Sequence, residues 1–113
     1  MLKEKFRRVK RDRVSHKHSM ELAYIRYMSF IEQCRRENAC GIRGYVENHH
    51  IIPFFLGGNN FYDNMIPLTV LQHHRAHVLL HEYVASYVKK DSNVYKYSQQ
   101  AVEACGYRAS STM

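Results

Sequence analysis

Histidines crowd into one short part of this chain. Six of the eight histidines fall between residues 49 and 81. Imidazole is the commonest metal ligand in proteins and the side chain that most readily exchanges a proton near neutral pH. A compact fold must bring several of these imidazoles close together, so a metal site or a proton-transfer site is the first hypothesis that the sequence raises.

The spacing of the histidines favours a site shared between a helix and a strand. His73 and His77 are four residues apart, which places both side chains on one face of a helix. His49 and His50 are adjacent in a segment rich in β-branched residues, and neighbouring side chains on a strand point to opposite faces. One of these two could bind an ion while the other transfers a proton. Three imidazoles with an open fourth position are typical of catalytic rather than structural zinc sites.

A histidine pair at helical spacing is, taken alone, more often a surface feature than a metal site. The adjacent pair in the strand strengthens the metal hypothesis, because a helix and a strand can converge on one point. We expect His81, one helical turn further along, to pack against neighbouring side chains or to contact a metal-binding residue instead of the ion. His74 is expected to face solvent or phosphate.

The pattern of apolar and turn-forming residues predicts an α+β fold. Thr69 and Gln72 have the spacing of a capping box, which would open a long helix. Two short β segments precede this helix, and a loop containing Gly57 and Gly58 separates them. The expected order is a helix at about 20–37 opened by Ser19, strands at 44–52 and 65–68, a helix from Thr69 to about Lys89, and a helix from about Val94 to Gly106.

Positive charge is concentrated at the N-terminus. The 113 residues carry a formal net charge of +7, and eight basic and two acidic side chains in residues 1–18 account for +6 of it. Such an excess attracts polyanions, so nucleic acid is the expected partner. We divide the chain into a basic arm (1–18), a single domain (19–108) with its motif core at 44–85, and a tail (109–113). The arm residues expected to contact nucleic acid are Lys3, Lys5, Arg7, Arg8, Lys10, Arg11, Arg13 and Lys17.

Membrane insertion and export are not expected. No run of eighteen apolar residues occurs, and Glu21 and Arg26 interrupt the first apolar stretch after the arm. Cys34, Cys40 and Cys105 are an odd number without a C-x-x-C pair, which argues against a disulfide framework. These features predict a soluble protein of a reducing cytoplasm.

Five motifs, in this order along the chain, resemble the HNH endonuclease family. They are ENHHIIP at residues 47–53, Gly57-Gly58, Asp63-Asn64, Leu68-Thr69 and His73-x-x-x-His77. They are similar to motifs of phage-type HNH homing endonucleases and of DNase colicin nuclease domains, and they span about residues 42–82. The resemblance implies a ββα-metal (His-Me finger) core, here flanked by an N-terminal helix with its basic arm and by a C-terminal helix.

The resemblance implies a role for each histidine of the motif. His50 corresponds to the general base, which takes a proton from the attacking water, and a neutral imidazole suits that role. His49, His73 and His77 correspond to the ligands of one divalent ion. The ion would be Mg²⁺, Mn²⁺, Zn²⁺ or Ni²⁺, because imidazole ligands favour the transition metals and cellular availability favours Mg²⁺.

Two further motif positions and two arginines complete the expected site. By resemblance, Asn64 braces the loop and orients the ring of His50, and Glu47 orients a basic partner or the base. From the residues alone, the alternative for Asn64 is a loop-capping amide and the alternative for Glu47 is an exposed strand acid. Leu71 stands where relatives often carry a basic residue, so Arg43 and Arg75 are the candidate phosphate contacts in the body.

These observations predict a metal-dependent endonuclease that hydrolyses phosphodiester bonds in double-stranded DNA, by nicking or by cutting both strands. One site cuts one strand, so a double-strand break would need a homodimer or two successive cleavage events. Three alternatives stay open: a non-catalytic DNA-binding module with a structural zinc, a toxin-type nuclease, and an accessory protein such as a phage packaging component. If the chain is phage-encoded, its place of action is the cytoplasm of the bacterial host.

Overall fold

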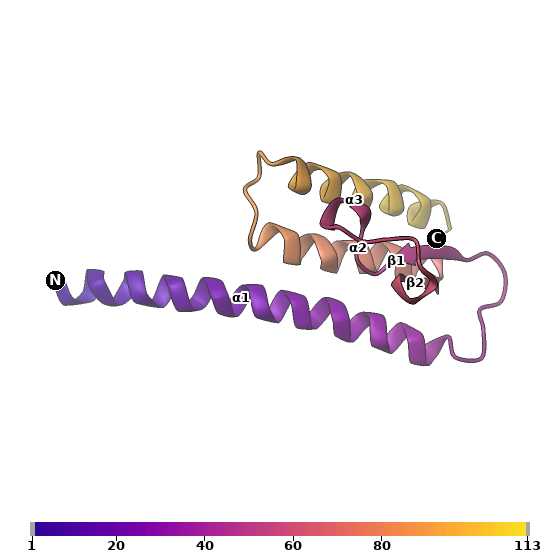
Figure 1. Ribbon diagram of the computed structural model, residues 1–113, viewed down its shortest axis with the longest axis horizontal. Coiled ribbons are helices and arrows are strands. Elements are labelled where there is room, and N and C mark those ends of the chain that lie inside the picture. Colours follow the sequence, from indigo (N-terminus) through magenta and orange to yellow (C-terminus); the bar gives the residue numbers. More distant parts are fainter. Residues whose placement is uncertain (1, 113) are drawn as a thin grey trace.

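A two-stranded antiparallel sheet and the helix that follows it form the centre of the molecule (Figure 1). The computed structural model describes the backbone of residues 2–112 and the side chains of residues 17–111. β1 (Glu47–His50) pairs with β2 (Met65–Leu68), and α2 (Val70–Ala85) begins two residues after β2. The predicted α+β class and the ββα order of the motif are therefore confirmed.

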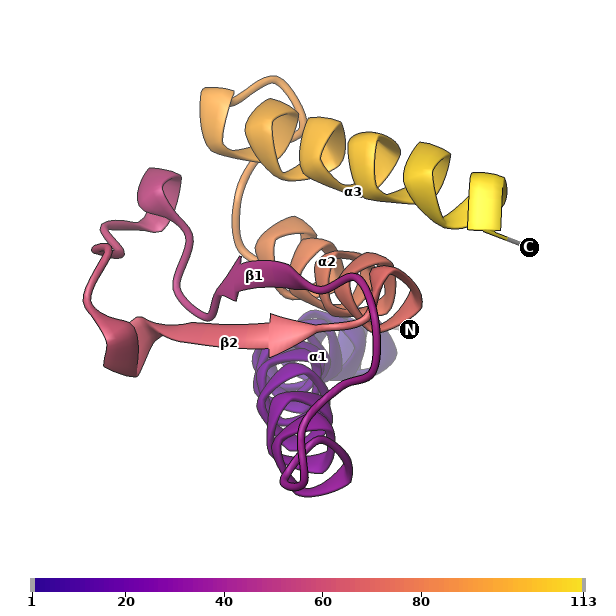
Figure 2. The same cartoon turned by 90° about the vertical axis from the view of Figure 1, so that its right-hand side faces the viewer.

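Two further helices cover opposite sides of this ββα unit. α1 (Leu2–Glu37) and α3 (Asn93–Thr112) lie on either side of α2 and the hairpin (Figure 2). The connection between the strands contains two short 3-10 helices, η1 (Phe54–Leu56) and η2 (Tyr62–Asn64). No helix in the described part of the chain is both long enough and apolar enough to cross a membrane.

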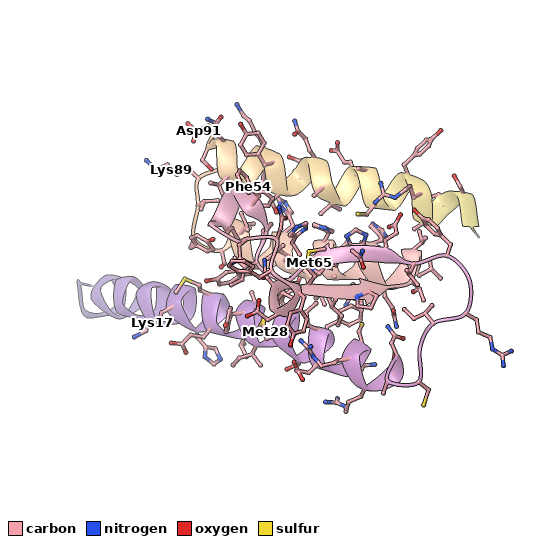
Figure 3. All side chains as sticks on the ribbon, turned by 45° about the vertical axis from the view of Figure 1, so that its right-hand side comes forward. Lys17, Met28, Phe54, Met65, Lys89 and Asp91 are labelled. Carbon is pink, nitrogen blue, oxygen red and sulfur yellow. The ribbon has the colours of Figure 1, made fainter. Side chains whose placement is uncertain are left out.

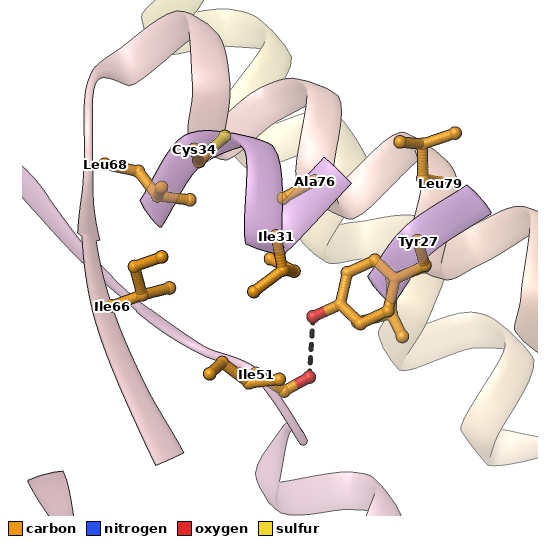
Figure 4. Close-up of a cluster of buried hydrophobic side chains, with 9 residues drawn as sticks. Tyr27, Ile31, Cys34, Ile51, Ile66, Leu68, Ala76 and Leu79 are labelled. Atoms are coloured by element: carbon orange, nitrogen blue, oxygen red, sulfur yellow. Dashed lines mark hydrogen bonds between the residues drawn. The ribbon is translucent and has the colours of Figure 1, made fainter. Parts of the chain in front are cut away.

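The main hydrophobic core lies between α1, the hairpin and α2 (Figure 4). Helical spacing on α1 places one apolar row against the sheet, and the alternation of β2 turns its apolar side chains toward the same space. Burial of such side chains is the main term that stabilises a domain of this size. The core consists of Tyr27, Ile31, Cys34, Ile51, Ile66, Leu68, Ala76, Leu79 and Leu80.

α1 is longer than the sequence predicts. Its backbone is helical from Leu2, whereas the expected helix began at about Met20 with Ser19 as its N-cap. Residues 1–18 contain no glycine or proline and are rich in Lys, Arg and other good helix formers, so nothing stops the helix from extending through them. The basic segment is thus a helical extension of α1, and Ser19 lies inside the helix.

The capping box at Thr69 is confirmed. The Thr69 side chain accepts a hydrogen bond from the backbone N–H of Gln72, and the Gln72 side chain accepts one from the backbone N–H of Thr69. The helix ends at Ala85, about four residues earlier than expected, and Ser86 closes it with a hydrogen bond to the Tyr83 carbonyl. β1 is also shorter than its predicted range, since Gly44 adopts a positive φ of 86° outside the strand.

α3 continues past the glycine at which it was expected to end. Gly106 lies inside the helix and faces α2, where an added Cβ would be 3.0 Å from Nε2 of His74. It permits a close approach of two helices and is not a helix stop. The helix runs to Thr112, so the expected tail is helical over residues 109–112, and Ala109 is buried with 2% of its surface exposed.

Candidate metal centre

Three imidazoles converge between β1 and α2. One ligand nitrogen from each of His49, His73 and His77 lies within 4.8 Å of the others. Their ring centroids are 5.1 Å apart for His49 and His73, 4.8 Å for His49 and His77, and 4.9 Å for the pair on α2. The helical repeat places the rings of His73 and His77 on one face of α2, and β1 contributes the ring of His49 that packs against them. The three predicted ligands are therefore brought together.

The donor set fits a divalent ion. His49 is fully buried, and its Nδ1 atom is the one buried side-chain nitrogen or oxygen without a hydrogen-bond partner among the described residues. Leaving such an atom unpaired costs about 1–3 kcal/mol, so a partner is missing at this position. An ion held between the three rings would supply it, and imidazole is a favoured ligand of Zn²⁺, Ni²⁺ and related ions.

Burial keeps two of the imidazoles neutral. Removal from water lowers the pKa of His49 to about 2 and that of His77 to about 4, and repulsion from the neighbouring imidazolium groups acts in the same direction. A metal ligand must carry a free lone pair, which a protonated ring lacks. These two rings are therefore in a state that can bind an ion at neutral pH.

Glu47 forms a hydrogen bond with the ring of His73. Its Oε1 accepts a hydrogen bond of 2.8 Å from Nδ1 of His73, which leaves Nε2 of that ring free for an ion. A carboxylate in this position fixes the orientation of a ligand ring and raises its basicity. The interpretation of Glu47 as an exposed strand acid is wrong, because only 8% of its surface is exposed. It contacts the ring of His73, a predicted ligand, and a basic partner, not the expected base His50.

The basic partner of Glu47 is Arg108 of α3. Arg108 donates through Nε to Oε2 at 2.6 Å and through Nη2 to Oε1 at 3.2 Å. Arg108, and to a lesser extent His73 and the Tyr45 hydroxyl, stabilise the charged carboxylate and lower the pKa of Glu47 to about 2. No sequence pattern indicates this contact, because Arg108 lies 61 residues from its partner and outside the motif.

His50 lies on the open side of the site. Its ring is half-buried and borders a groove of about 340 Å³ together with His73, His77 and Arg108. The prediction that His49 and His50 point to opposite sides of the strand is borne out, since His49 is fully buried and His50 is not. Phe54 also lines this groove, and Figure 3 shows it beside α3.

Asn64 braces the loop but does not hold the ring of His50. Its side chain accepts from the Ile52 N–H at 2.9 Å and donates to the carbonyl groups of Ile52 and Asn59 at 2.9 and 2.8 Å. The ring of His50 is bonded instead to Asn60, with Nε2 and Oδ1 2.8 Å apart. The orienting role expected of Asn64 thus belongs to Asn60. Both residues lie in one Asn-rich loop, so sequence reasoning found the loop but not the residue.

The other two histidines of α2 lie outside the three-ring cluster. His81 bonds through Nδ1 to the hydroxyl group of Ser98 at 3.0 Å and packs on Tyr95, so the expected packing role is confirmed. His74 is half-buried against Gly106 and therefore faces α3, not open solvent as predicted.

The candidate nucleic-acid contacts lie away from the groove or beyond the described side chains. Arg43 and Arg75 are exposed, and neither lines the groove. Lys17 is exposed and projects from α1 (Figure 3). The remaining arm residues fall outside the described side chains: Lys3, Lys5, Arg7, Arg8, Lys10, Arg11 and Arg13.

Comparison with known proteins gives one short similarity. A stretch of 36 residues is 53% identical to part of the probable mobile endonuclease D of Enterobacteria phage T4. This stretch resembles a phage mobile endonuclease. It covers 32% of the chain and 14% of the phage protein, so the chain corresponds to a small part of that relative. No protein-family model matches the chain, and no solved structure matches it.

Proposed function

We propose that the chain is a metal-dependent endonuclease of the HNH type that hydrolyses phosphodiester bonds in DNA. The observation that carries the proposal is the convergence of His49, His73 and His77 beside a fourth imidazole, His50, on the edge of an open groove. A purely structural ion would not require that fourth ring or an opening to solvent. The short similarity to a phage mobile endonuclease supports the same reaction class.

The residues of the groove suit phosphodiester hydrolysis. When bound, a divalent ion would neutralise charge on the phosphate and on the departing 3′ oxygen. His50 is the proposed general base: the free nitrogen of its ring accepts a proton from the water whose oxygen attacks phosphorus. Arg108 lines the groove with its side chain 42% exposed, so it can donate to a phosphate oxygen while Glu47 holds its position.

The proposed substrate is double-stranded DNA, and the basic extension of α1 is its proposed electrostatic contact. The eight Lys and Arg side chains of residues 3–17 would bind phosphates without reading sequence. One such site cuts one strand, and a homodimer would be needed to cut both strands at once. The proposed place of action is the cytoplasm of a bacterial host, in keeping with the phage origin of the similar protein.

A plasmid assay tests the proposal. Purified protein is incubated with supercoiled plasmid and with Mg²⁺, Mn²⁺, Zn²⁺ or Ni²⁺, and the conversion to open-circular and linear DNA is followed on gels. His50→Ala is expected to reduce cleavage by about two to four orders of magnitude and to leave metal binding intact, because a general base contributes that much. His18→Ala is the matched control, since His18 is exposed on α1 and outside the cluster.

The outcomes separate the proposal from its rivals. Cleavage that depends on an added ion and on His50 supports it. Tight binding of metal and DNA without cleavage under any ion would favour the non-catalytic DNA-binding module instead. Loss of metal affinity in His50→Ala would mean that His50 is a ligand and that its role and that of His49 are exchanged.

A further inference from the structure

We propose that Tyr27 is a positioning residue whose hydroxyl group fixes the tautomer of His49, so that Nδ1 of this ring faces the ion. The inference rests on the proposed metal-binding function. Tyr27 lies on α1, 22 residues before His49 and outside the ββα unit. From the sequence it is one more apolar residue of a helical row.

Two short distances determine where the hydroxyl proton lies. The Tyr27 oxygen is 2.6 Å from the carbonyl oxygen of Ile51 and 2.8 Å from Nε2 of His49 (Figure 4 shows the first bond). A carbonyl oxygen only accepts hydrogen bonds, and a tyrosine hydroxyl has one proton to donate. That proton must therefore lie between Tyr27 and Ile51. The contact with His49 then requires a proton on Nε2, which donates to the tyrosine oxygen.

The tautomer of His49 follows from this bonding. A neutral imidazole carries one proton, so a proton on Nε2 leaves Nδ1 with its lone pair free. Nδ1 is the buried atom for which the described residues offer no hydrogen-bond partner. The nitrogen that Tyr27 leaves unprotonated is thus the same nitrogen that lacks a partner, and its ring is one of the three in the cluster.

Burial makes this arrangement persistent. Tyr27 is 2% exposed, His49 is 0% exposed and Ile51 is 8% exposed. Water therefore has little access to exchange partners with either ring, and a buried hydrogen bond in a low-dielectric setting is strong. The Ile51 carbonyl lies just past the end of β1, where it is not used by the pairing with β2. It is available as the fixed acceptor that orients the tyrosine.

The test uses Tyr27→Phe, which keeps the ring in the core and removes only the hydroxyl group. Tyr24→Phe is the matched control, because Tyr24 is one helical turn away, half-exposed and in contact with the ring of Tyr83. In the metal-free protein, long-range ¹H–¹⁵N spectra of the imidazole nitrogens report the tautomer directly. Co²⁺ absorption titrations report metal affinity without any measurement of cleavage.

The expected result has two parts. Wild-type His49 is expected to show a protonated Nε2 and an unprotonated Nδ1, whereas Tyr27→Phe is expected to show a mixture of tautomers. Co²⁺ affinity is expected to fall by about 10- to 100-fold in Tyr27→Phe, the usual effect of removing a group that orients a metal ligand. Tyr24→Phe is expected to match the wild type in both measurements.

A protonated Nδ1 in wild-type His49 would overturn the inference, and this spectrum decides the matter even if Tyr27→Phe does not fold. An unchanged tautomer and unchanged Co²⁺ affinity in a folded Tyr27→Phe would overturn it as well. A wild-type protein that binds Co²⁺ through the expected tautomer but cleaves no DNA would contradict the nuclease proposal and support the role of Tyr27. The two failures are therefore distinguishable.

Discussion

Nε2 of His50 lies 2.8 Å from Oδ1 of Asn60, ten residues further along the chain in the loop between the strands. An amide oxygen accepts hydrogen bonds and does not donate them, so the His50 nitrogen in this contact carries the proton. The other ring nitrogen, Nδ1, is then the one available to accept a proton from water. In the proposed mechanism, Asn60 decides which nitrogen of the base is active.

Replacement of Asn60 by alanine is expected to slow plasmid cleavage by about tenfold, because one orienting hydrogen bond of about 1.4 kcal/mol is lost. Asn60→Asp keeps an acceptor at the same place and is expected to retain most of the activity. Both variants are expected to bind metal as the wild type does. Equal activity in Asn60→Ala and the wild type would remove Asn60 from the site.

Removal of the Arg108 side chain, the cation that pairs with Glu47, is expected to destabilise the fold. Arg108→Ala leaves a largely buried carboxylate with His73 and Tyr45 as its remaining partners, which costs about 1–3 kcal/mol. Arg26→Ala is the control, because Arg26 and Glu82 form an exposed pair at 3.8 Å that is worth less than about 1 kcal/mol. Urea unfolding measures both. Equal losses in the two variants would contradict the importance of the Glu47–Arg108 pair.

The two adjacent glycines of the loop are expected to respond differently to alanine. A Cβ at Gly58 would lie 1.7 Å from the carbonyl oxygen of Ile52, so Gly58→Ala must displace the segment that Asn64 braces, at a cost of at least about 2 kcal/mol. Gly57 has a φ of 89° and open space around it, so Gly57→Ala is expected to cost only the strain of that conformation, about 1–2 kcal/mol. Thermal unfolding of both variants checks the order. A smaller loss at Gly58 than at Gly57 would contradict the close approach to Ile52.

The stability of the metal-free protein is expected to fall as the pH is lowered from about 6.5 to 4. The folded protein keeps His77, with a pKa of about 4, and His49, with a pKa of about 2, neutral in this range. The unfolded chain binds protons on both, so the free energy of unfolding drops by about 1.4 kcal/mol per pH unit for each ring. Glu47 adds its own loss only below about pH 4.5, as its carboxylate becomes protonated. Urea unfolding in the presence of a chelator measures the slope.

His77→Gln is the control for this pH dependence. The substitution removes one of the two titrating rings, so the slope is expected to become shallower by up to about 1.4 kcal/mol per pH unit. A slope that is the same in His77→Gln and in the wild type would show that burial of His77 does not set the pH dependence.

Deletion of residues 1–17 is expected to weaken DNA binding and to flatten its dependence on salt. If about four to six of the basic side chains contact phosphates, log affinity for DNA should fall with log salt at a slope of about −4 to −5 in the full chain. The shortened chain keeps all residues of the metal site and of the core, so it is expected to fold and to bind metal. An unchanged slope would contradict the role of residues 1–17 and would indicate that other basic residues bind the phosphates: Arg35, Arg36, Arg43 and Arg75.

The parts of the fold that depend on neighbouring residues were predictable. The capping box needs only Thr69 and Gln72, and the shared helix face needs only the spacing of His73 and His77, so local rules suffice for both. The alternation of β1 implied only that one of His49 and His50 would face this pair, and the resemblance to the HNH family assigned His49 as the third candidate ligand. The extension of α1 was missed because a basic sequence without breakers does not itself mark where a helix begins.

The contacts that complete the site were not predictable, because they join residues far apart in sequence. Tyr27 reaches His49 across 22 residues, and Arg108 reaches Glu47 across 61. Tyr27 and Arg108 each fit an ordinary helical pattern in the sequence. Only the packing of α1 and α3 around the ββα unit directs these two side chains toward the site. Asn60 was missed for a different reason, since an Asn-rich loop offers several amides of equal chemical suitability.

The helices at the two ends of the chain each insert one side chain into the site that the middle third builds. A fragment cut at the borders of the motif, residues 44–85, would carry all the proposed metal ligands yet lack both Tyr27 and Arg108. Gene fusion or recombination that moved this segment alone into another protein would transfer the histidines without the groups that orient them. The smallest unit that can be transplanted with its site intact therefore extends from α1 to the last turns of α3, which is most of the chain.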